Sequence, residues 1–150
     1  MPKFEITTHI NQAPEVVHQA FIDPDNALQW TKDLVKFEVV SGNGEEAGAV
    51  AHLHYNQKGK SYIMEDVLEY CEPGRKYISC VSGGGLSARV ETTIDPADSG
   101  TDITMIWAGT GQNLIIKVIL WIMRRKIKRG AQEELDTFKN LTETHGSRFP

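Results

Sequence analysis

The stretch from residue 35 to residue 110 consists of short segments in which apolar and polar residues alternate, separated by turn signals. Alternation with a period of two is typical of half-buried β-strands. The turns at Lys58-Gly59, Pro73-Gly74 and Gly83-Gly84-Gly85 are too short for a parallel crossover. The stretch therefore predicts an antiparallel sheet in which each strand pairs with the next one along the chain.

The flanking segments predict one further strand and three helices. Residues 3–11 alternate as a strand, and Pro14 and the Asp23-Pro24 pair then open two short helices, because proline is tolerated in a first helical turn. The last third predicts a long helix in which Gly130 costs roughly 1 kcal/mol against alanine and is compatible with a bend. Its apolar seam recurs at steps of three or four residues: Ile116, Leu120, Met123, Ile127, Ala131, Leu135, Phe138 and Leu141.

Composition and cysteine usage narrow the class of protein. With 150 residues, 40% hydrophobic and 24% charged, the chain is expected to form a single globular domain over residues 1–150. The net charge of −4 argues against nucleic acid as a partner, because phosphate binding needs a broad basic surface. The N-terminus has no apolar region of signal-peptide length. Cys80 should lie opposite Val67 or its neighbour rather than opposite Cys71, so we expect two free thiols and a cytoplasmic protein.

Residues 112–130, QNLIIKVILWIMRRKIKRG, are unusual for such a chain. A second apolar face joins the seam on the first three turns, and a basic run at 124–129 follows it. The apolar run is shorter than the roughly 20 residues of a membrane-spanning helix. A helix that is apolar nearly all round must bury both faces in something. The additional apolar residues are Ile115, Val118, Ile119, Trp121 and Ile122.

The order of strand, two short helices, six strands and one long helix resembles the SRPBCC superfamily. This superfamily includes START-like lipid-binding domains, plant pollen allergens, and bacterial polyketide cyclase/dehydrase and lipid-transport proteins. Residues 6–34, 37–55, 67–77 and 100–107 carry the resemblance, which extends over essentially the whole chain. It implies an α+β helix-grip fold, in which a curved seven-stranded antiparallel sheet wraps round the C-terminal helix and leaves a deep apolar cavity. In such a fold the second apolar helix face would help to wall the cavity and its mouth.

The alternation of side chains predicts which strand residues face the interior. The inward sets are Ala49, Ala51, Leu53 and Tyr55 in the second predicted strand of the meander, Leu86, Ala88, Val90 and Thr92 in the fifth, and Ile103, Met105 and Trp107 in the last. We expect Trp30, Tyr77, Ile116 and Leu120 to complete the ligand-binding surface with Leu53, Tyr55, Val90, Met105 and Trp107.

Residues 61–71 leave open which carboxylate faces the cavity. A two-residue turn at Pro73-Gly74 places Asp66 on the same face as Tyr77, whereas a longer turn or a bulge places Glu65 there. The resemblance to the pollen allergens favours Glu65 as the inward carboxylate, and Asp66 is the alternative. A carboxylate in an apolar cavity has a raised pKa, which suits acid–base chemistry or the orientation of a ligand hydroxyl.

Other chemical motifs give no support for a metal or a cofactor, and we expect neither. His52 and His54 point the same way along a strand, but spacing supplies no third ligand for a zinc site. Residues 42–48, GNGEEAG, lack the Gly-Lys-Ser/Thr ending of a phosphate-binding loop. The sequence contains no GxSxG, CxxC or HExxH motif.

Three functions remain open from the sequence. The excess apolar helix face and the inward aromatic residues favour a module that binds a hydrophobic small molecule, such as a lipid or polyketide. A cofactor-independent cyclase or dehydratase would use Glu65 or Asp66 as its acid–base group and Tyr77 to orient the substrate. The third is a docking protein that uses Ile115, Ile119, Ile122 and the basic run 124–129 for transient membrane contact or for a homodimer.

Overall fold

Seven strands and three helices build the protein, whose computed structural model describes residues 2–150. The predicted order of elements is confirmed. The elements are β1 (Lys3–Ile10), α1 (Pro14–Ile22), α2 (Pro24–Trp30), β2 (Leu34–Ser41), β3 (Val50–Gln57), β4 (Lys60–Glu72), β5 (Lys76–Gly83), β6 (Leu86–Ala97), β7 (Gly100–Gly111) and α3 (Leu114–His145).

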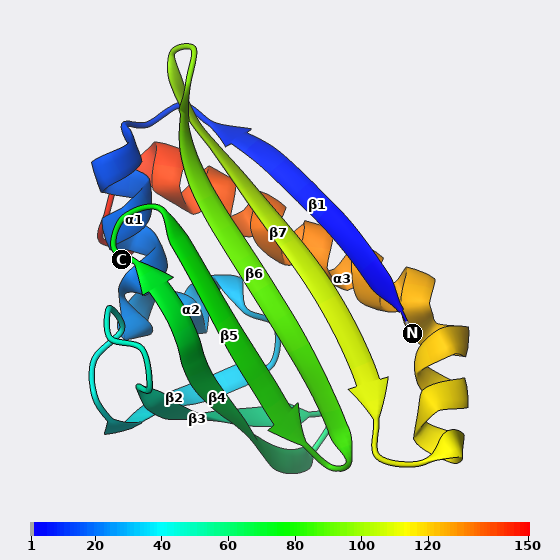
Figure 1. The fold of residues 1–150 in the computed structure, drawn as a ribbon. Coiled ribbons are helices and arrows are strands. Elements are labelled where there is room, and N and C mark those ends of the chain that lie inside the picture. Colours follow the sequence, from blue (N-terminus) through cyan, green and yellow to red (C-terminus); the bar gives the residue numbers. More distant parts are fainter. Residues whose placement is uncertain (1) are drawn as a thin grey trace.

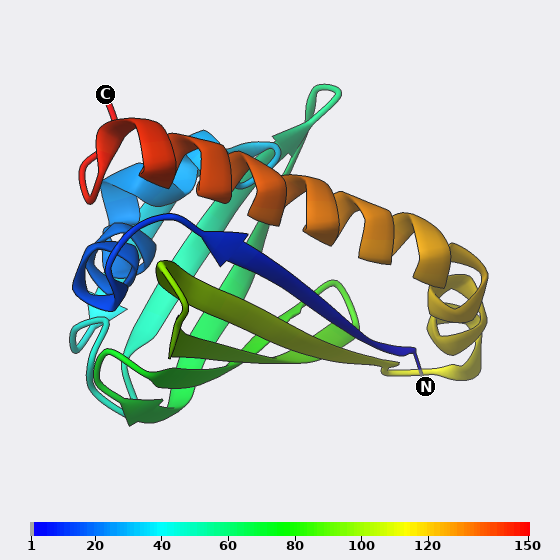
Figure 2. The ribbon, with the colours of Figure 1, turned by 90° about the horizontal axis from the view of Figure 1, so that it is seen from above.

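All seven strands belong to one antiparallel sheet with the order β1-β7-β6-β5-β4-β3-β2. Strands β2 to β7 pair with their neighbours in sequence, and β1 returns to the edge of β7. Figures 1 and 2 show the strongly curved sheet with α3 lying across one of its faces, and α1 and α2 gathered near one end. The structure thus has the α+β helix-grip architecture that the resemblance implied.

Side-chain caps explain where two of the helices begin. Asp23 caps α2, since its carboxylate accepts a hydrogen bond of 2.9 Å from the Asp25 amide, and Pro24 follows in the first turn. Asn113 caps α3, since its side-chain oxygen accepts a bond of 3.0 Å from the Ile116 amide. Both caps satisfy amides that a helix N-terminus leaves unpaired.

The largest hydrophobic core lies where the second half of α3 crosses the sheet beside α1. Phe138 of α3 is fully buried there, with its ring centroid 5.1 Å from that of Trp30 and 6.1 Å from that of Phe21. Phe149, near the C-terminus, also packs on Phe138 at 6.0 Å. The core residues that α3 contributes belong to the seam predicted from its apolar spacing.

A buried asparagine attaches the C-terminal tail to the helices. Asn26 in α2 is 1% exposed, and its amide nitrogen donates to the carbonyls of Ala20 and Ser147 at 3.1 and 2.8 Å. Its side-chain oxygen accepts a bond of 2.9 Å from the Phe149 amide. These bonds hold Phe149 in the core that the second half of α3 also joins.

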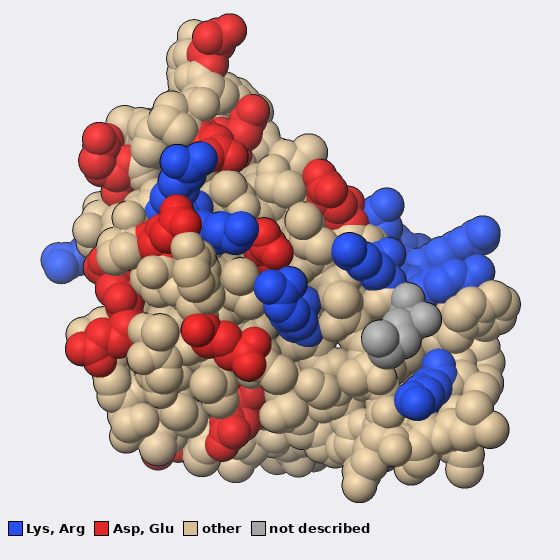
Figure 3. Space-filling model, viewed as in Figure 1, with Lys and Arg blue, Asp and Glu red and all other residues tan. Residues whose placement is uncertain are grey.

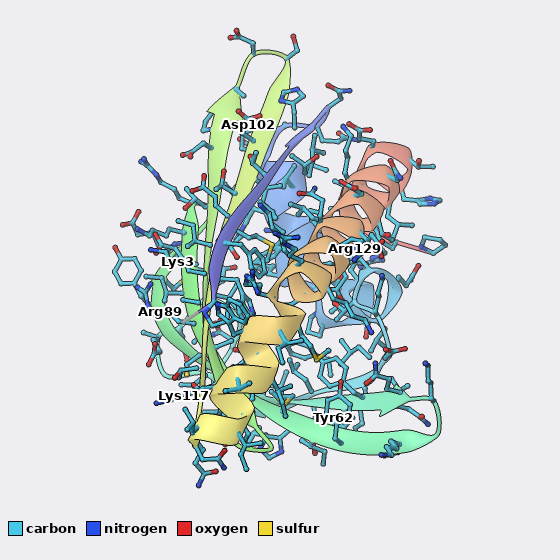
Figure 4. The ribbon with its side chains drawn as sticks, turned by 90° about the vertical axis from the view of Figure 1, so that its right-hand side faces the viewer. Lys3, Tyr62, Arg89, Asp102, Lys117 and Arg129 are labelled. Atoms are coloured by element: carbon cyan, nitrogen blue, oxygen red, sulfur yellow. The ribbon has the colours of Figure 1, made fainter. Side chains whose placement is uncertain are left out.

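The second apolar face on the first turns of α3 does not wall the cavity, so this prediction was wrong. Figures 1 and 4 show that α3 changes direction between its early turns, which contain Lys117, and its later turns, which contain Arg129. The early turns present their second apolar face to solvent rather than to the sheet, with Ile115 72% and Ile122 65% exposed. Hydropathy correctly marked these residues as apolar, but the path of the helix leaves that face uncovered.

Candidate functional site

A cavity of about 540 Å³ lies between the concave face of the sheet, α2 and the middle of α3. Most of the side chains around it are aliphatic or aromatic. Seven of the residues predicted for the ligand-binding surface line it: Trp30, Leu53, Tyr55, Tyr77, Val90, Met105 and Trp107. The cavity has the size and the apolar lining that are typical of sites for small hydrophobic molecules.

Three other predicted residues lie away from the cavity. Glu65 is on the outer face of the sheet, where its side chain is 52% exposed and lies 3.8 Å from His52 Nε2. Leu120 is buried and Ile116 is partly buried, but both precede Ile127, the first residue of α3 that reaches the cavity. Ile116 instead packs against the end of β7, where a Cβ atom on Gly111 would come within 2.7 Å of its Cγ2.

The register of β4 explains why Asp66, rather than Glu65, faces inward. The turn after β4 contains three residues, because Glu72 pairs with Lys76, and this longer turn alone would have turned Glu65 inward. A bulge between Leu68 and Tyr70 adds a second one-residue offset. The two offsets cancel, so Asp66 pairs with Val81 and points into the cavity. The expectation that Glu65 is the inward carboxylate was therefore wrong, and the alternative holds.

Asp66 is a carboxyl group in largely apolar surroundings. Burial raises its pKa, and a hydrogen bond from the Ser79 side chain opposes the shift in part. Ser79 lies on the neighbouring strand β5, two residues before Val81, the partner of Asp66, and it also lines the cavity. Loss of hydration therefore outweighs the hydrogen bond, which favours the protonated form of Asp66.

Glu134 on α3 is a second carboxyl group that lines the cavity, and it was not among the residues predicted for the site. One carboxylate oxygen accepts a hydrogen bond of 2.7 Å from the Lys32 amide, while burial raises the pKa of the group. Ile127, Gly130 and Ala131 share its inner face of α3. Their spacing of three and four residues was the signal in the sequence that could have identified Glu134.

Tyr55 on β3 lies near both carboxyl groups. Burial raises its pKa well above that of a free tyrosine, and the charges of Glu134 and Asp66 add to the shift. Its ring stacks on that of Tyr62 in β4, with centroids 5.0 Å apart. The phenol therefore stays protonated near neutral pH, as a hydroxyl group that can donate a hydrogen bond.

Tyr77 contributes its ring to the cavity, but its hydroxyl group is already bound within the protein. The Gly74 amide donates to this oxygen at 3.1 Å, and His18 Nδ1 lies 2.6 Å from it. Burial raises the pKa of Tyr77 to about 12. On the other side of the imidazole, His18 Nε2 lies 3.7 Å from a Glu45 oxygen. His18 was not identified from the sequence, because no local pattern links α1 to β5.

Trp30 provides a polar atom that still needs a partner. Its Nε1 atom is buried, and it has no hydrogen-bond partner within residues 2–150. A buried donor without an acceptor costs about 1–3 kcal/mol. The indole ring belongs to the cavity wall, but Nε1 itself is covered by protein and does not open into the cavity.

Trp107 shows how the sheet makes room for a large ring. The indole lies along β7 over Gly109, where an added Cβ would come within 2.3 Å of the ring. Phe4 on the paired strand β1 stacks on Trp107, with centroids 5.1 Å apart. The glycine is thus required by the close approach of the ring that forms this part of the cavity wall.

The histidine pair on β3 lies on the opposite side of the sheet from the cavity. His54 Nε2 is 2.9 Å from a Glu38 oxygen, and His52 lies between Glu38 and Glu65 at 3.8 Å from each. Within residues 2–150, no group of three histidine, cysteine or acidic side chains is arranged to hold a metal ion.

These features define a class of protein: a helix-grip fold whose curved sheet and last helix enclose an apolar cavity with two carboxyl groups. The sequence model of the polyketide cyclase / dehydrase and lipid transport family matches residues 1–143. The chain therefore belongs to this family, and the resemblance to the SRPBCC superfamily is confirmed. No curated protein matches it in sequence.

Solved structures support the same fold. A protein from Chromobacterium violaceum, CV1439, superposes with a TM-score of 0.77 at 17% identity, covering 95% of this chain and 99% of that one. Ara h 8.0201 gives 0.74 at 16% identity, with 95% and 98% covered. The di-domain ARO/CYC StfQ from the steffimycin biosynthetic pathway gives 0.76 at 12% identity, with 95% of this chain and 51% of that chain covered.

Proposed function

We propose that this protein binds an apolar small molecule, such as a lipid or a polyketide, between the sheet and α3. The observation that carries the proposal is the cavity of about 540 Å³ with its largely apolar wall. At about 30 Å³ for each water, a volume of this size would hold on the order of fifteen to twenty water molecules. An apolar ligand would replace water that the wall cannot hydrogen-bond.

The polar groups of the cavity indicate what else the ligand carries. Asp66, Glu134 and Tyr55 can each form a hydrogen bond with a hydroxyl group of the ligand. The proposed ligand is therefore an apolar molecule with a few oxygen substituents rather than a plain hydrocarbon.

Binding can be tested with the uncharged fluorophore N-phenyl-1-naphthylamine, whose emission rises in apolar sites. Ala51→Phe fills part of the cavity, because Ala51 lines it from β3. His52→Phe is the matched control, since His52 is the next residue of the same strand and lies on the outer face. We expect Ala51→Phe to weaken binding by about tenfold and His52→Phe to leave it unchanged. Equal binding by both variants would place the probe elsewhere and overturn the proposal.

A natural ligand can be sought by mass spectrometry of the purified protein under native and denaturing conditions. A stoichiometric adduct that dissociates on unfolding, and that Ala51→Phe no longer retains, would identify the ligand class. An adduct retained equally by Ala51→Phe would show that it is bound outside this cavity.

A second candidate function is a cofactor-independent cyclase or dehydratase. The observation that favours it is the pair of cavity carboxyl groups, Asp66 and Glu134, whose pKa values are both raised by burial. A carboxyl group with a raised pKa keeps its proton to a higher pH than a solvated one and is a stronger base once ionised, which suits acid–base catalysis. The molecule recovered from the native protein would be incubated with the wild type, with Asp66→Asn and with Glu134→Gln. Catalysis requires a product that differs by loss of water or by ring closure, and that the variants form more slowly while still binding.

We also propose a reducing compartment, the cytoplasm, for this protein. Cys71 and Cys80 are free within the described chain, and Cys80 pairs with Val67 across the β4–β5 ladder rather than with Cys71. Thiol titration of the protein extracted under alkylating conditions should give two reactive groups after unfolding. Recovery of both residues as oxidised adducts would contradict this.

A further inference from the structure

The start of α3 carries an exposed apolar surface, which we call the docking segment (residues 114–123). Seven large apolar side chains in these ten residues are between 39% and 74% exposed. Monomeric proteins rarely expose this many adjacent apolar side chains without a partner. The exposed side chains are Leu114, Ile115, Val118, Ile119, Trp121, Ile122 and Met123.

Helical geometry places a group of cations on the same side as this apolar surface. With about 100° between successive residues, Ile116 and Leu120 face inward and Ile115, Val118 and Ile122 face outward. One to two turns further on, Arg125 and Arg129 follow along that outer side. The docking segment therefore has a buried inner side and an apolar outer side. The cations of residues 124–129 follow directly after its C-terminal end.

The charge around the docking segment is of one sign. Six cations occur between Lys117 and Arg129, and no acidic residue occurs from Ile103 to Gln132, although the whole chain has a net charge of −4. Figure 3 shows Lys and Arg side chains gathered at the end of the molecule where α3 begins, with acidic side chains mainly over the rest of the view. A partner for this surface must be apolar and negatively charged.

We propose that residues 114–129 dock the protein on an anionic lipid surface. The apolar side chains would enter the boundary between headgroups and acyl chains, while the cations would contact lipid phosphates. Trp121 suits this boundary: the residue is 57% exposed, and the Arg124 guanidinium lies 4.0 Å from the centroid of its ring. Within residues 2–150, none of the helices combines the length and hydropathy that a bilayer crossing requires.

The same charges argue against a second copy of this chain as the occupant. A two-fold symmetric dimer through this surface would collect the six cations of each copy in one interface, with no acidic residue from 103–132 to pair with them. Such like charges repel when they are brought close together, whereas an anionic bilayer neutralises them. This inference does not depend on what the cavity binds, and it is tested without a cavity ligand.

The experiment is co-sedimentation with vesicles of phosphatidylcholine alone or with roughly one third phosphatidylglycerol. We expect binding only to the anionic vesicles, and we expect it to weaken as salt rises from about 0.05 to 0.5 M. The double variant Ile115→Ser/Ile122→Ser should bind at least about tenfold more weakly. Val35→Ser/Val40→Ser is its matched control, since both valines are exposed on β2, and it should bind like the wild type.

The cations are tested separately from the apolar residues. Arg125→Glu/Lys126→Glu should abolish binding to the anionic vesicles, whereas Lys58→Glu/Lys60→Glu, at the exposed β3–β4 turn, should lower it only slightly. Trp121→Phe should still bind, but quenching of tryptophan emission by brominated lipid should fall.

Circular dichroism melting of each variant confirms that it is folded. The proposal is overturned if anionic and neutral vesicles bind alike. Equal binding by the wild type and the Ile115/Ile122 variant also overturns it. A third contradicting result would be sedimentation equilibrium in which the wild type is a dimer and the Ile115/Ile122 variant is a monomer.

Discussion

Gly130 offers a direct test of whether the interior of this fold is open space. It lies in the middle of α3, where glycine costs about 1 kcal/mol relative to alanine because its backbone loses more freedom on folding. A Cβ atom added there would meet nothing within 4 Å in the described structure, and Gly130 lines the cavity. Packing therefore does not require the glycine.

We expect Gly130→Ala to raise the free energy of unfolding by about 1 kcal/mol, the full difference in helix propensity. For a chain of this length such a change raises the melting temperature by roughly 2–4 °C. Thermal and urea unfolding of the apo protein would measure it. An unchanged or lower stability would mean that the new methyl group meets a neighbour, and the reasoning from open space would be refuted.

Gly130→Phe extends the same test from stability to binding. A benzyl group at this position occupies part of the cavity, so the affinity for N-phenyl-1-naphthylamine should fall by about tenfold or more. Lys128→Phe provides the matched control, because Lys128 is exposed on the same helix. If both variants bind the probe equally well, the space beside Gly130 is not the binding site.

Three further predictions concern groups that hold or line the interior. Burial raises the pKa of Asp66 above its unfolded value of about 3.8, so ionisation of this group opposes folding. The free energy of unfolding therefore falls as the pH rises from about 3.8 through the folded pKa. Asp66→Asn should therefore stabilise the protein in urea at pH 8 but not at pH 3, and a gain that is the same at both values would contradict this. Phe138→Ala should lower the free energy of unfolding by about 3–5 kcal/mol, because a fully buried ring is lost; a loss below 1 kcal/mol in urea would show that the core collapses around the gap. Asn26→Ala should cost about 2–3 kcal/mol and speed amide exchange at Phe149, whose amide it binds, and unchanged exchange there would count against the tail contact.

Several parts of the cavity wall could be predicted from single strands. Ala51, Leu53 and Tyr55 face inward because side chains alternate across a strand and the opposite positions are polar. Met105 and Trp107 follow from the same rule on β7. These assignments depend only on neighbours within one segment, so local sequence contained the information.

The inward carboxyl groups could not be assigned in the same way. Whether Asp66 or Glu65 faces the cavity depends on the turn after β4 and on the bulge before Tyr70. Each shifts the register by one residue, and together they leave Asp66 facing inward. A bulge is stabilised by the curvature of the whole sheet, which no segment reveals alone. Glu134 was not predicted for a related reason: Glu133 and Asp136 beside it are charged as well, and its environment depends on how α3 crosses the sheet.

The amino-acid sequence by itself determined the order of the elements, the antiparallel meander, the amphipathic seam of α3 and the apolar character of its first turns. Each of these follows from periodicity and turn chemistry over a few residues. Only the tertiary structure decided that the cavity ends near Ile127, and that Ile115, Trp121 and Ile122 lie in solvent rather than against the sheet. The reason is that hydropathy states what a side chain would gain from burial, whereas the path of the backbone decides whether anything is there to bury it.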